Sequence, residues 1–119
     1  MRCLIVDDNE TFLNVARRVL EQDGLNVVGV ASTGTEALRQ FAALRPDVVL
    51  VDIFLGDESG LGVVRQLAEQ EQADDAALIL ISTRPDAAGL TAGSAATGFL
   101  AKTELSASAV RRIADGSVT

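Results

Sequence analysis

The sequence predicts an α/β fold in which helices cover both faces of one parallel β-sheet. Short apolar runs recur along the chain, and the segments between them place apolar residues at helical spacing. Strands buried on both faces read as continuous apolar runs, and their alternation with helices favours right-handed crossovers into a parallel sheet. The runs that we expect to be strands are residues 3–6, 27–31, 48–51, 76–81 and 99–101.

Capping residues and helix breakers delimit the expected helices. The first helix has the clearest helical spacing, and the residues of its apolar face are Phe12, Leu13, Ala16, Val19 and Leu20. For the second helix, Thr33 and Glu36 form a capping box at its start and Pro46 prevents its continuation. The fourth, residues 86–94, is weak because it contains two glycines, each of which costs ~1 kcal/mol relative to alanine. The other helices are expected between the N-cap Asn9 and Gly24, from near Ser59, and over residues 104–114.

Length and composition indicate a single domain spanning residues 1–119. A chain of 119 residues with 48% apolar residues can bury a core without disulfides, and its single cysteine, Cys3, lies in an apolar run and suggests an inert buried thiol. The net charge of −7 disfavours direct binding to nucleic acid or to an anionic membrane. No apolar run approaches the roughly 18 residues of a membrane helix, so we expect a cytoplasmic location. Residues 115–119 are either a frayed end or the start of a linker.

Charged and hydroxyl side chains follow four of the five expected strands. Ligands bind beyond the carboxyl ends of the strands in an open parallel sheet, so side chains at these ends are candidates for a site. The candidates are Asp7 and Asp8 after the first strand, Asp52 after the third, Ser82 and Thr83 after the fourth, and Lys102 after the fifth.

The three acids suggest a site for a divalent cation. Carboxylates brought to one edge repel each other and raise at least one pKa unless a cation neutralises them. Oxygen ligands without histidine or cysteine favour Mg²⁺, Mn²⁺ or Ca²⁺, and Mg²⁺ in particular leaves coordination positions open for a phosphate. Any one of these acids alone would be read as a loop residue that caps a helix. Their combination with Ser82 and Lys102 indicates a functional site.

From Arg2 to Ile113 the chain resembles the receiver domains of two-component response regulators, of which the chemotaxis regulators are examples. The matching blocks are LIVDDN, VVLVDIFLGDESGLG, LILIST and TGFLAK. The resemblance implies a flavodoxin-like three-layer sandwich with a five-stranded parallel sheet of order 2-1-3-4-5. It also implies a phosphoacceptor function.

The resemblance assigns the metal and acceptor roles. Asp52 corresponds to the phosphoacceptor, Asp8 to a direct ligand of Mg²⁺ (or Mn²⁺), and Asp7 to a residue that acts mainly through metal-bound water. The backbone carbonyl of Phe54 corresponds to a further ligand. Phosphoryl transfer requires neutralisation of charge on the transferred oxygens, which a metal at these positions supplies.

Three further residues correspond to the phosphoryl contact and the switch. Lys102 would contact the phosphoryl oxygens, Ser82 would move to hydrogen-bond the new group, and Phe99 occupies the aromatic switch position. Without the resemblance, Phe99 reads as a core residue, Ser82 as an ordinary hydroxyl and Lys102 as a counterion of the acids. Phosphorylation would thus change a loop and a rotamer.

The resemblance also implies partners. The phosphoryl group would come from a histidine kinase, a phosphotransfer protein or a small acyl phosphate, and the signal would pass to an output protein or an appended effector domain. Such a domain assists its own phosphorylation and slow dephosphorylation but is not a turnover enzyme. Receivers also commonly form homodimers. The chain shows no basic patch or helix-turn-helix pattern of its own.

Two positions depart from the family pattern. Thr103 follows the lysine where most relatives have proline, so we expect a trans peptide there, because a non-proline cis bond costs ~2.5–4 kcal/mol. Gly56 replaces a common proline in the loop after Asp52, which suggests looser loop geometry. Together with the weak fourth helix, it suggests a mobile output face.

Three alternatives stay open at this point. A haloacid-dehalogenase-type phosphatase would need an acid two residues after its nucleophile; only the pair Asp8 and Glu10 offers this, and the chain has no room for a cap domain. A flavodoxin-like cofactor carrier would need a phosphate-binding loop after the first strand, where Asp7 and Asp8 would repel phosphate. A degenerate receiver without phosphotransfer would not need the acid and lysine set.

Overall fold

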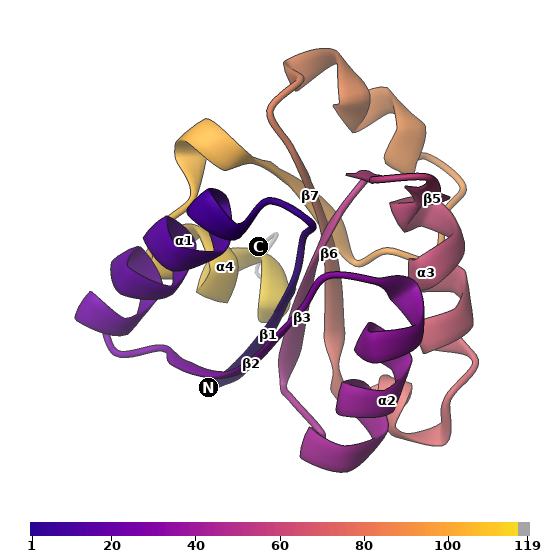
Figure 1. Ribbon diagram of the computed structural model, residues 1–119, viewed down its shortest axis with the longest axis horizontal. Coiled ribbons are helices and arrows are strands. Elements are labelled where there is room, and N and C mark those ends of the chain that lie inside the picture. Colours follow the sequence, from indigo (N-terminus) through magenta and orange to yellow (C-terminus); the bar gives the residue numbers. More distant parts are fainter. Residues whose placement is uncertain (117–119) are drawn as a thin grey trace.

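The protein folds as a five-stranded parallel sheet between two layers of helices, as seen in a computed structural model that describes residues 1–116 (Figure 1). The sheet order is β2-β1-β3-β6-β7, which is the predicted order 2-1-3-4-5 of the five main strands. All four strand pairs are parallel. The strands are β1 (Arg2–Val6), β2 (Asn26–Ala31), β3 (Val48–Asp52), β6 (Ala77–Ser82) and β7 (Gly98–Ala101).

Alternate residues of the central strands pack against opposite helical layers, which confirms the three-layer prediction. Helices α1 (Glu10–Gln22) and α4 (Ala107–Ala114) cover one face, where they pack on a core that includes Ile5. Helices α2 (Gly34–Leu44) and α3 (Gly60–Ala68) cover the other face (Figure 1). Because side chains alternate along a strand, strands that are apolar at every position serve both cores.

The predicted caps hold α1 and α2 at their starts. The side chain of Asn9 accepts a hydrogen bond of 3.1 Å from the backbone N–H of Phe12, and Thr33 accepts one of 3.1 Å from Glu36. The carboxylate of Glu36 accepts from the backbone N–H of Ser32, which lies one residue before the cap. Such caps satisfy backbone donors that have no partner within the helix. The start of each helix therefore follows from local sequence.

The fourth predicted helix is wrong as an α-helix. In place of a helix over residues 86–94 the chain forms a 3-10 segment, η2 (Pro85–Thr91), followed by Gly93 with φ +79°. Glycine lacks a Cβ and adopts this left-handed conformation without strain, whereas a continuing helix would need a negative φ. The glycines of this segment thus outweigh its apolar pattern.

The last helix is shorter than the predicted span 104–114. A 3-10 turn, η3 (Lys102–Glu104), follows β7, and α4 begins only at Ala107. The reason is a local cap, because the hydroxyl of Ser106 accepts a hydrogen bond of 3.0 Å from the N–H of Ala109. The sequence also gave no indication of the short β4–β5 hairpin (Phe54–Leu55 with Glu58–Ser59) or of η1 (Glu71–Asp75).

Several smaller expectations can be compared with the described residues. Cys3 is fully buried, and burial raises the pKa of its thiol to about 12, which fits the expected inert role. No cis peptide occurs in residues 1–116, so the bond before Thr103 is trans as expected. In the same range no helix has the length and apolarity to cross a membrane. Of the predicted tail, residues 117–119 lie outside the described part.

Candidate functional site

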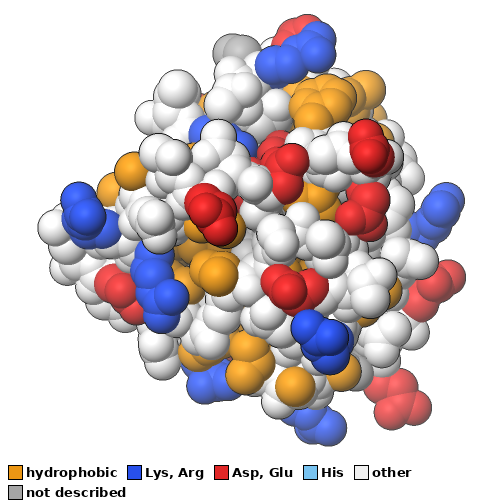
Figure 2. All heavy atoms as spheres, in the orientation of Figure 1, with side chains coloured by type: hydrophobic (Ala, Val, Ile, Leu, Met, Phe, Trp, Pro, Cys, Tyr) orange, Lys and Arg blue, Asp and Glu red, His pale blue; other side chains and the backbone are white. Residues whose placement is uncertain are grey.

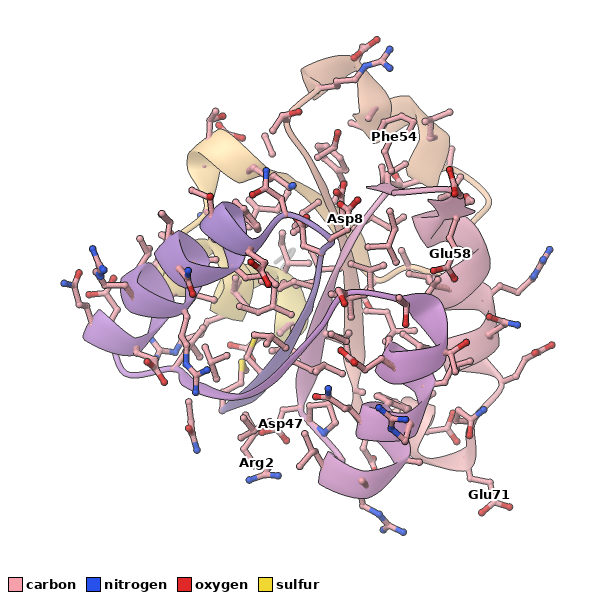
Figure 3. The ribbon with its side chains drawn as sticks, viewed as in Figure 1. Arg2, Asp8, Asp47, Phe54, Glu58 and Glu71 are labelled. Carbon is pink, nitrogen blue, oxygen red and sulfur yellow. The ribbon has the colours of Figure 1, made fainter. Side chains whose placement is uncertain are left out.

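Three acids meet at the carboxyl ends of β1 and β3. These neighbouring strands place Asp7 and Asp52 side by side, and the carboxylate oxygens of Asp7, Asp8 and Asp52 lie within 4.8 Å of one another. Asp7 is fully buried, Asp52 is 7% exposed, and Asp8 is exposed. Figure 3 shows Asp8 beyond the ends of the strands, and Figure 2 shows other acidic side chains on the same face. The predicted acidic cluster is therefore present.

Lys102 is the counterion of this cluster. Its Nζ lies 2.5 Å from Oδ2 of Asp7 and 3.4 Å from Oδ2 of Asp52, and its side chain is only 10% exposed. Among residues 1–116 it is the only cationic side chain paired with these acids, and it is the only lysine of the sequence. One positive charge thus faces three carboxylates, which leaves the site with excess negative charge.

The environment of Asp52 destabilises its charged form. Burial raises the pKa of the carboxyl group most, and the negative charge of Asp7 raises it further. Lys102 and the backbone N–H of Phe54, which donates a hydrogen bond of 3.2 Å to Oδ1, lower the pKa without cancelling the increase. Any positive charge added beside Asp52 would thus stabilise the charged form of its carboxyl group.

The Asp52→Asn variant is expected to be more stable than the native protein at pH 7 in the absence of divalent cations. The pKa of Asp52 is higher in the folded than in the unfolded state. Stability should therefore fall as the pH rises through the ordinary value of 3.8 to the raised value, and the penalty should be complete above it. Asparagine carries no such penalty. Urea unfolding in EDTA at pH 4 and pH 7 measures this.

The advantage of Asp52→Asn should be larger at pH 7 than at pH 4. Asp57→Asn is the matched control, because Asp57 is exposed in the nearby hairpin and its substitution should change stability little at either pH. An advantage that is equal at both pH values would mean that loss of a buried charge is not its cause.

The residues present fit a hard divalent cation. Oδ1 of Asp7 accepts a hydrogen bond of 2.9 Å from the backbone N–H of Asn9, but the buried Oδ2 accepts none from the described residues. The close approach of Lys102 to Oδ2 is an ion pair without hydrogen-bond geometry. An all-carboxylate donor set with excess negative charge is typical of Mg²⁺ and Mn²⁺ sites.

The predicted switch residues Ser82 and Phe99 lie on β6 and β7, the two strands beyond β3 in the sheet. Ser82 is buried at the end of β6, one residue beyond the strand partner of Asp52, and its Oγ accepts a hydrogen bond of 3.0 Å from the N–H of Arg84. Phe99 is partly buried against the α2/α3 core. The ring of Phe54 is 46% exposed and lies 5.2 Å below the guanidinium of Arg84 (Figure 3).

Glycines shape the loop that carries Asp52, and sequence reasoning missed one of them. A Cβ on Gly60 would lie 1.9 Å from the backbone oxygen of Asp52, so this close approach requires glycine. Gly56 has φ +57°, which proline cannot adopt and which glycine adopts without strain. The loop is a paired hairpin, and Glu58 accepts a hydrogen bond of 3.1 Å from the N–H of Gly34. These contacts oppose the looser geometry expected from Gly56.

A second residue that sequence reasoning did not place at the site is Phe12. The sequence assigns it to the buried face of α1, and its ring does pack against the core. The centroid of this ring lies 4.2 Å from Nζ of Lys102. This contact depends on how α1 is rotated relative to β7, and no pattern in the sequence indicates that rotation.

Comparison with known proteins identifies the family. The family model of the response regulator receiver domain matches residues 3–114. The chain belongs to this family. Response regulators of two-component systems generally use such domains to accept a phosphoryl group on an aspartate, with Mg²⁺ in an acidic pocket. Receiver domains interact with histidine kinases or phosphotransfer proteins and with output domains, and they are generally not enzymes.

Individual relatives agree with this assignment. The receiver domain of the putative response regulator NarL from Mycobacterium tuberculosis is 32% identical, with a TM-score of 0.82 over 97% of this chain and 96% of that chain. A response regulator from Burkholderia pseudomallei, solved with a phosphorylated aspartic acid, calcium ion and citrate, is 26% identical, with a TM-score of 0.79 over 98% and 69% of the two chains.

The curated relatives are longer proteins. Protein-glutamate methylesterase/protein-glutamine glutaminase 3 of Hahella chejuensis is 41% identical over 70 residues, which are 59% of this chain and 20% of that protein. The match thus spans about a fifth of the relative, and other response regulators match over about a third of their length. The similarity is confined to the receiver part of these proteins. It does not extend to the regions that carry the activities for which they are named.

Proposed function

We propose that this receiver domain accepts a phosphoryl group on Asp52. Asp7, Asp8 and the backbone carbonyl of Phe54 would hold Mg²⁺ or Mn²⁺ beside it, and Lys102 would neutralise the transferred group. The observation that carries the proposal is the position of Asp52: a nearly buried carboxylate at the end of a central strand, next to a second buried carboxylate and to the only lysine. The phosphorylated aspartic acid and calcium ion of the Burkholderia relative support it by analogy.

The chemistry follows from the charges of the site. A carboxylate oxygen of Asp52 forms a bond to phosphorus as the bond to the donor breaks, and the donor leaves with that electron pair, giving an acyl phosphate. A divalent cation held by Asp7, Asp8 and the carbonyl of Phe54 would supply neutralisation of the phosphoryl oxygens. Lys102 needs to move little to contact these oxygens, since its Nζ is already 3.4 Å from Oδ2 of Asp52. The hydrogen bond from Phe54 N–H fixes the orientation of the acceptor.

The new negative charge would be transmitted through Ser82 and Phe99. The hydroxyl of Ser82 would turn from its contact with Arg84 N–H to donate to a phosphoryl oxygen. Phe99, which is partly buried against the core, would then repack between that core and the surface near η2. In this scheme the surface of η2 and β7 binds the output partner.

The rest of the proposal concerns the cellular context. A histidine kinase or phosphotransfer protein would supply the phosphoryl group, and an output protein or appended effector domain would receive the signal. Residues 1–119 would form a single cytoplasmic receiver domain that binds neither nucleic acid nor membrane by itself. It would assist its own phosphorylation and slow dephosphorylation without acting as a turnover enzyme. Homodimerisation is a further option within this scheme.

Intact-protein mass spectrometry after incubation with acetyl phosphate tests the acceptor. We expect one Mg²⁺-dependent phosphoryl adduct on the native chain and none on Asp52→Asn. The matched control is Asp57→Asn, which changes an exposed aspartate of the same loop and should still form the adduct. Because the sequence contains no histidine, an adduct that hydroxylamine removes is an acyl phosphate. An adduct on Asp52→Asn, or no adduct on a native chain shown to bind Mg²⁺, would contradict the proposal.

A further inference from the structure

We propose that Phe12 is a positioning residue that holds the ammonium group of Lys102 beside Asp52 through the face of its aromatic ring. This inference rests on the proposed function, because it concerns the lysine that would neutralise the phosphoryl group. It concerns a residue of α1 that lies outside the acidic cluster and offers no ligand atom to it.

The geometry is that of a cation–π contact in a partly dry environment. Nζ of Lys102 lies 4.2 Å from the centroid of the Phe12 ring, well within the ~6 Å over which the ring quadrupole attracts a cation. The lysine side chain is only 10% exposed, and such contacts are stronger when water is excluded. Within residues 1–116, Lys102 therefore contacts the carboxylates of Asp7 and Asp52 and the ring of Phe12.

Two hydrogen bonds link Phe12 to the acidic cluster. The backbone N–H of Phe12 donates to Oδ1 of Asn9 at 3.1 Å, and the backbone N–H of Asn9 donates to Oδ1 of Asp7 at 2.9 Å. Asp7 in turn pairs with Lys102 through its other oxygen. The start of α1 thus links the backbone of Phe12 to the carboxylate of Asp7 beside the lysine.

The ring is the one partner of Lys102 that a metal ion would not share. A hard divalent cation binds carboxylate oxygens, so it competes with the ammonium group for Asp7 and Asp52. Such a cation binds the face of an aromatic ring far more weakly than it binds carboxylate oxygens. When the carboxylates of Asp7 and Asp52 bind a metal ion, the contact with Phe12 remains and limits the motion of the flexible lysine side chain. The ring should therefore matter most in the state that accepts the phosphoryl group.

The test compares Phe12→Leu, which keeps an apolar side chain but removes the ring, with Phe12→Tyr, which keeps the ring. Phosphorylation by acetyl phosphate at saturating Mg²⁺ should slow about three- to tenfold in Phe12→Leu, as expected for loss of one cation–π contact. It should return to near the native rate in Phe12→Tyr. Val15→Ala is the matched control, because Val15 is exposed on the same helix and should leave the rate unchanged.

A second readout follows Lys102 directly, without metal or phosphate. Because the sequence has one lysine, selective isotope labelling gives a single set of lysine side-chain NMR signals. The ring should shift the methylene protons next to Nζ upfield in the native protein and in Phe12→Tyr, but not in Phe12→Leu. The same comparison with Mg²⁺ shows whether the contact persists when the acids bind a metal.

The outcomes separate this inference from the proposed function. A native lysine signal at its unfolded position, or one that Phe12→Leu leaves unchanged, would overturn the contact itself. A shifted signal combined with native phosphorylation rates in Phe12→Leu would overturn its positioning role. If the native chain shows the shifted signal but accepts no phosphoryl group, the proposed function fails while the contact stands.

Discussion

The Gly60→Ala variant is expected to lose about 2–4 kcal/mol of unfolding free energy, a large effect for one added methyl group. The Cβ would lie 1.9 Å from the backbone oxygen of Asp52 and 2.8 Å from Cα of Ile53. Both are backbone atoms, so no rotamer change relieves the clash. The N–H of Gly60 also donates a hydrogen bond of 2.7 Å to the backbone oxygen of Ile53, and any shift that makes room would weaken this bond. Chemical denaturation monitored by circular dichroism measures the loss.

Gly62→Ala is the matched control on the same helix. A Cβ at Gly62 meets nothing within 4 Å, and alanine favours helix by ~1 kcal/mol over glycine. This variant should therefore be as stable as the native protein or more stable. A Gly60→Ala protein with native stability would show that the loop after Asp52 can shift freely. In that case the close approach at Gly60 would not be what holds Asp52 in place.

The sheet and the charged site could be predicted because both depend on simple periodicity. Apolar runs mark strands buried on both faces, and the carboxyl ends of parallel strands must lie along one edge. Asp7, Asp52 and Lys102 directly follow or end such runs, so their convergence follows from topology without any side-chain detail. The resemblance to receiver domains was needed to assign roles to these residues. It was not needed to predict that they lie close together.

The features that sequence reasoning missed depend on distances between elements. Gly60 is visible in the sequence, but its need to be glycine comes from the backbone oxygen of Asp52 on another element. Phe12 fits an amphipathic helix equally well with or without a lysine against its ring. The error over residues 86–94 is different, because there the apolar pattern and the glycines disagreed and the local backbone preference prevailed.

The Lys102→Met variant is expected to separate phosphoryl transfer from metal binding, because in the proposed scheme the lysine would affect the two in opposite directions. Loss of the ammonium group should slow phosphorylation about 100-fold or more, the effect of removing one charge-stabilising donor from a transition state. Methionine keeps an unbranched apolar side chain but removes the ammonium group and with it the contact of Nζ with the Phe12 ring. The rate of adduct formation in intact-protein mass spectra measures this loss.

Mg²⁺ affinity of the same variant should rise, because Nζ no longer competes for Oδ2 of Asp7, from which it lies 2.5 Å in the native protein. In EDTA, Lys102→Met should be less stable than the native chain, since three carboxylates within 4.8 Å lose their counterion. Saturating Mg²⁺ should restore more stability to the variant than to the native protein by mass action. Lys102→Arg, which keeps the charge but not the compact ammonium, should retain most of the EDTA stability and little of the rate. Unchanged Mg²⁺ affinity with a near-native rate in Lys102→Met would reduce Lys102 to a surface counterion, which its burial between two acids argues against.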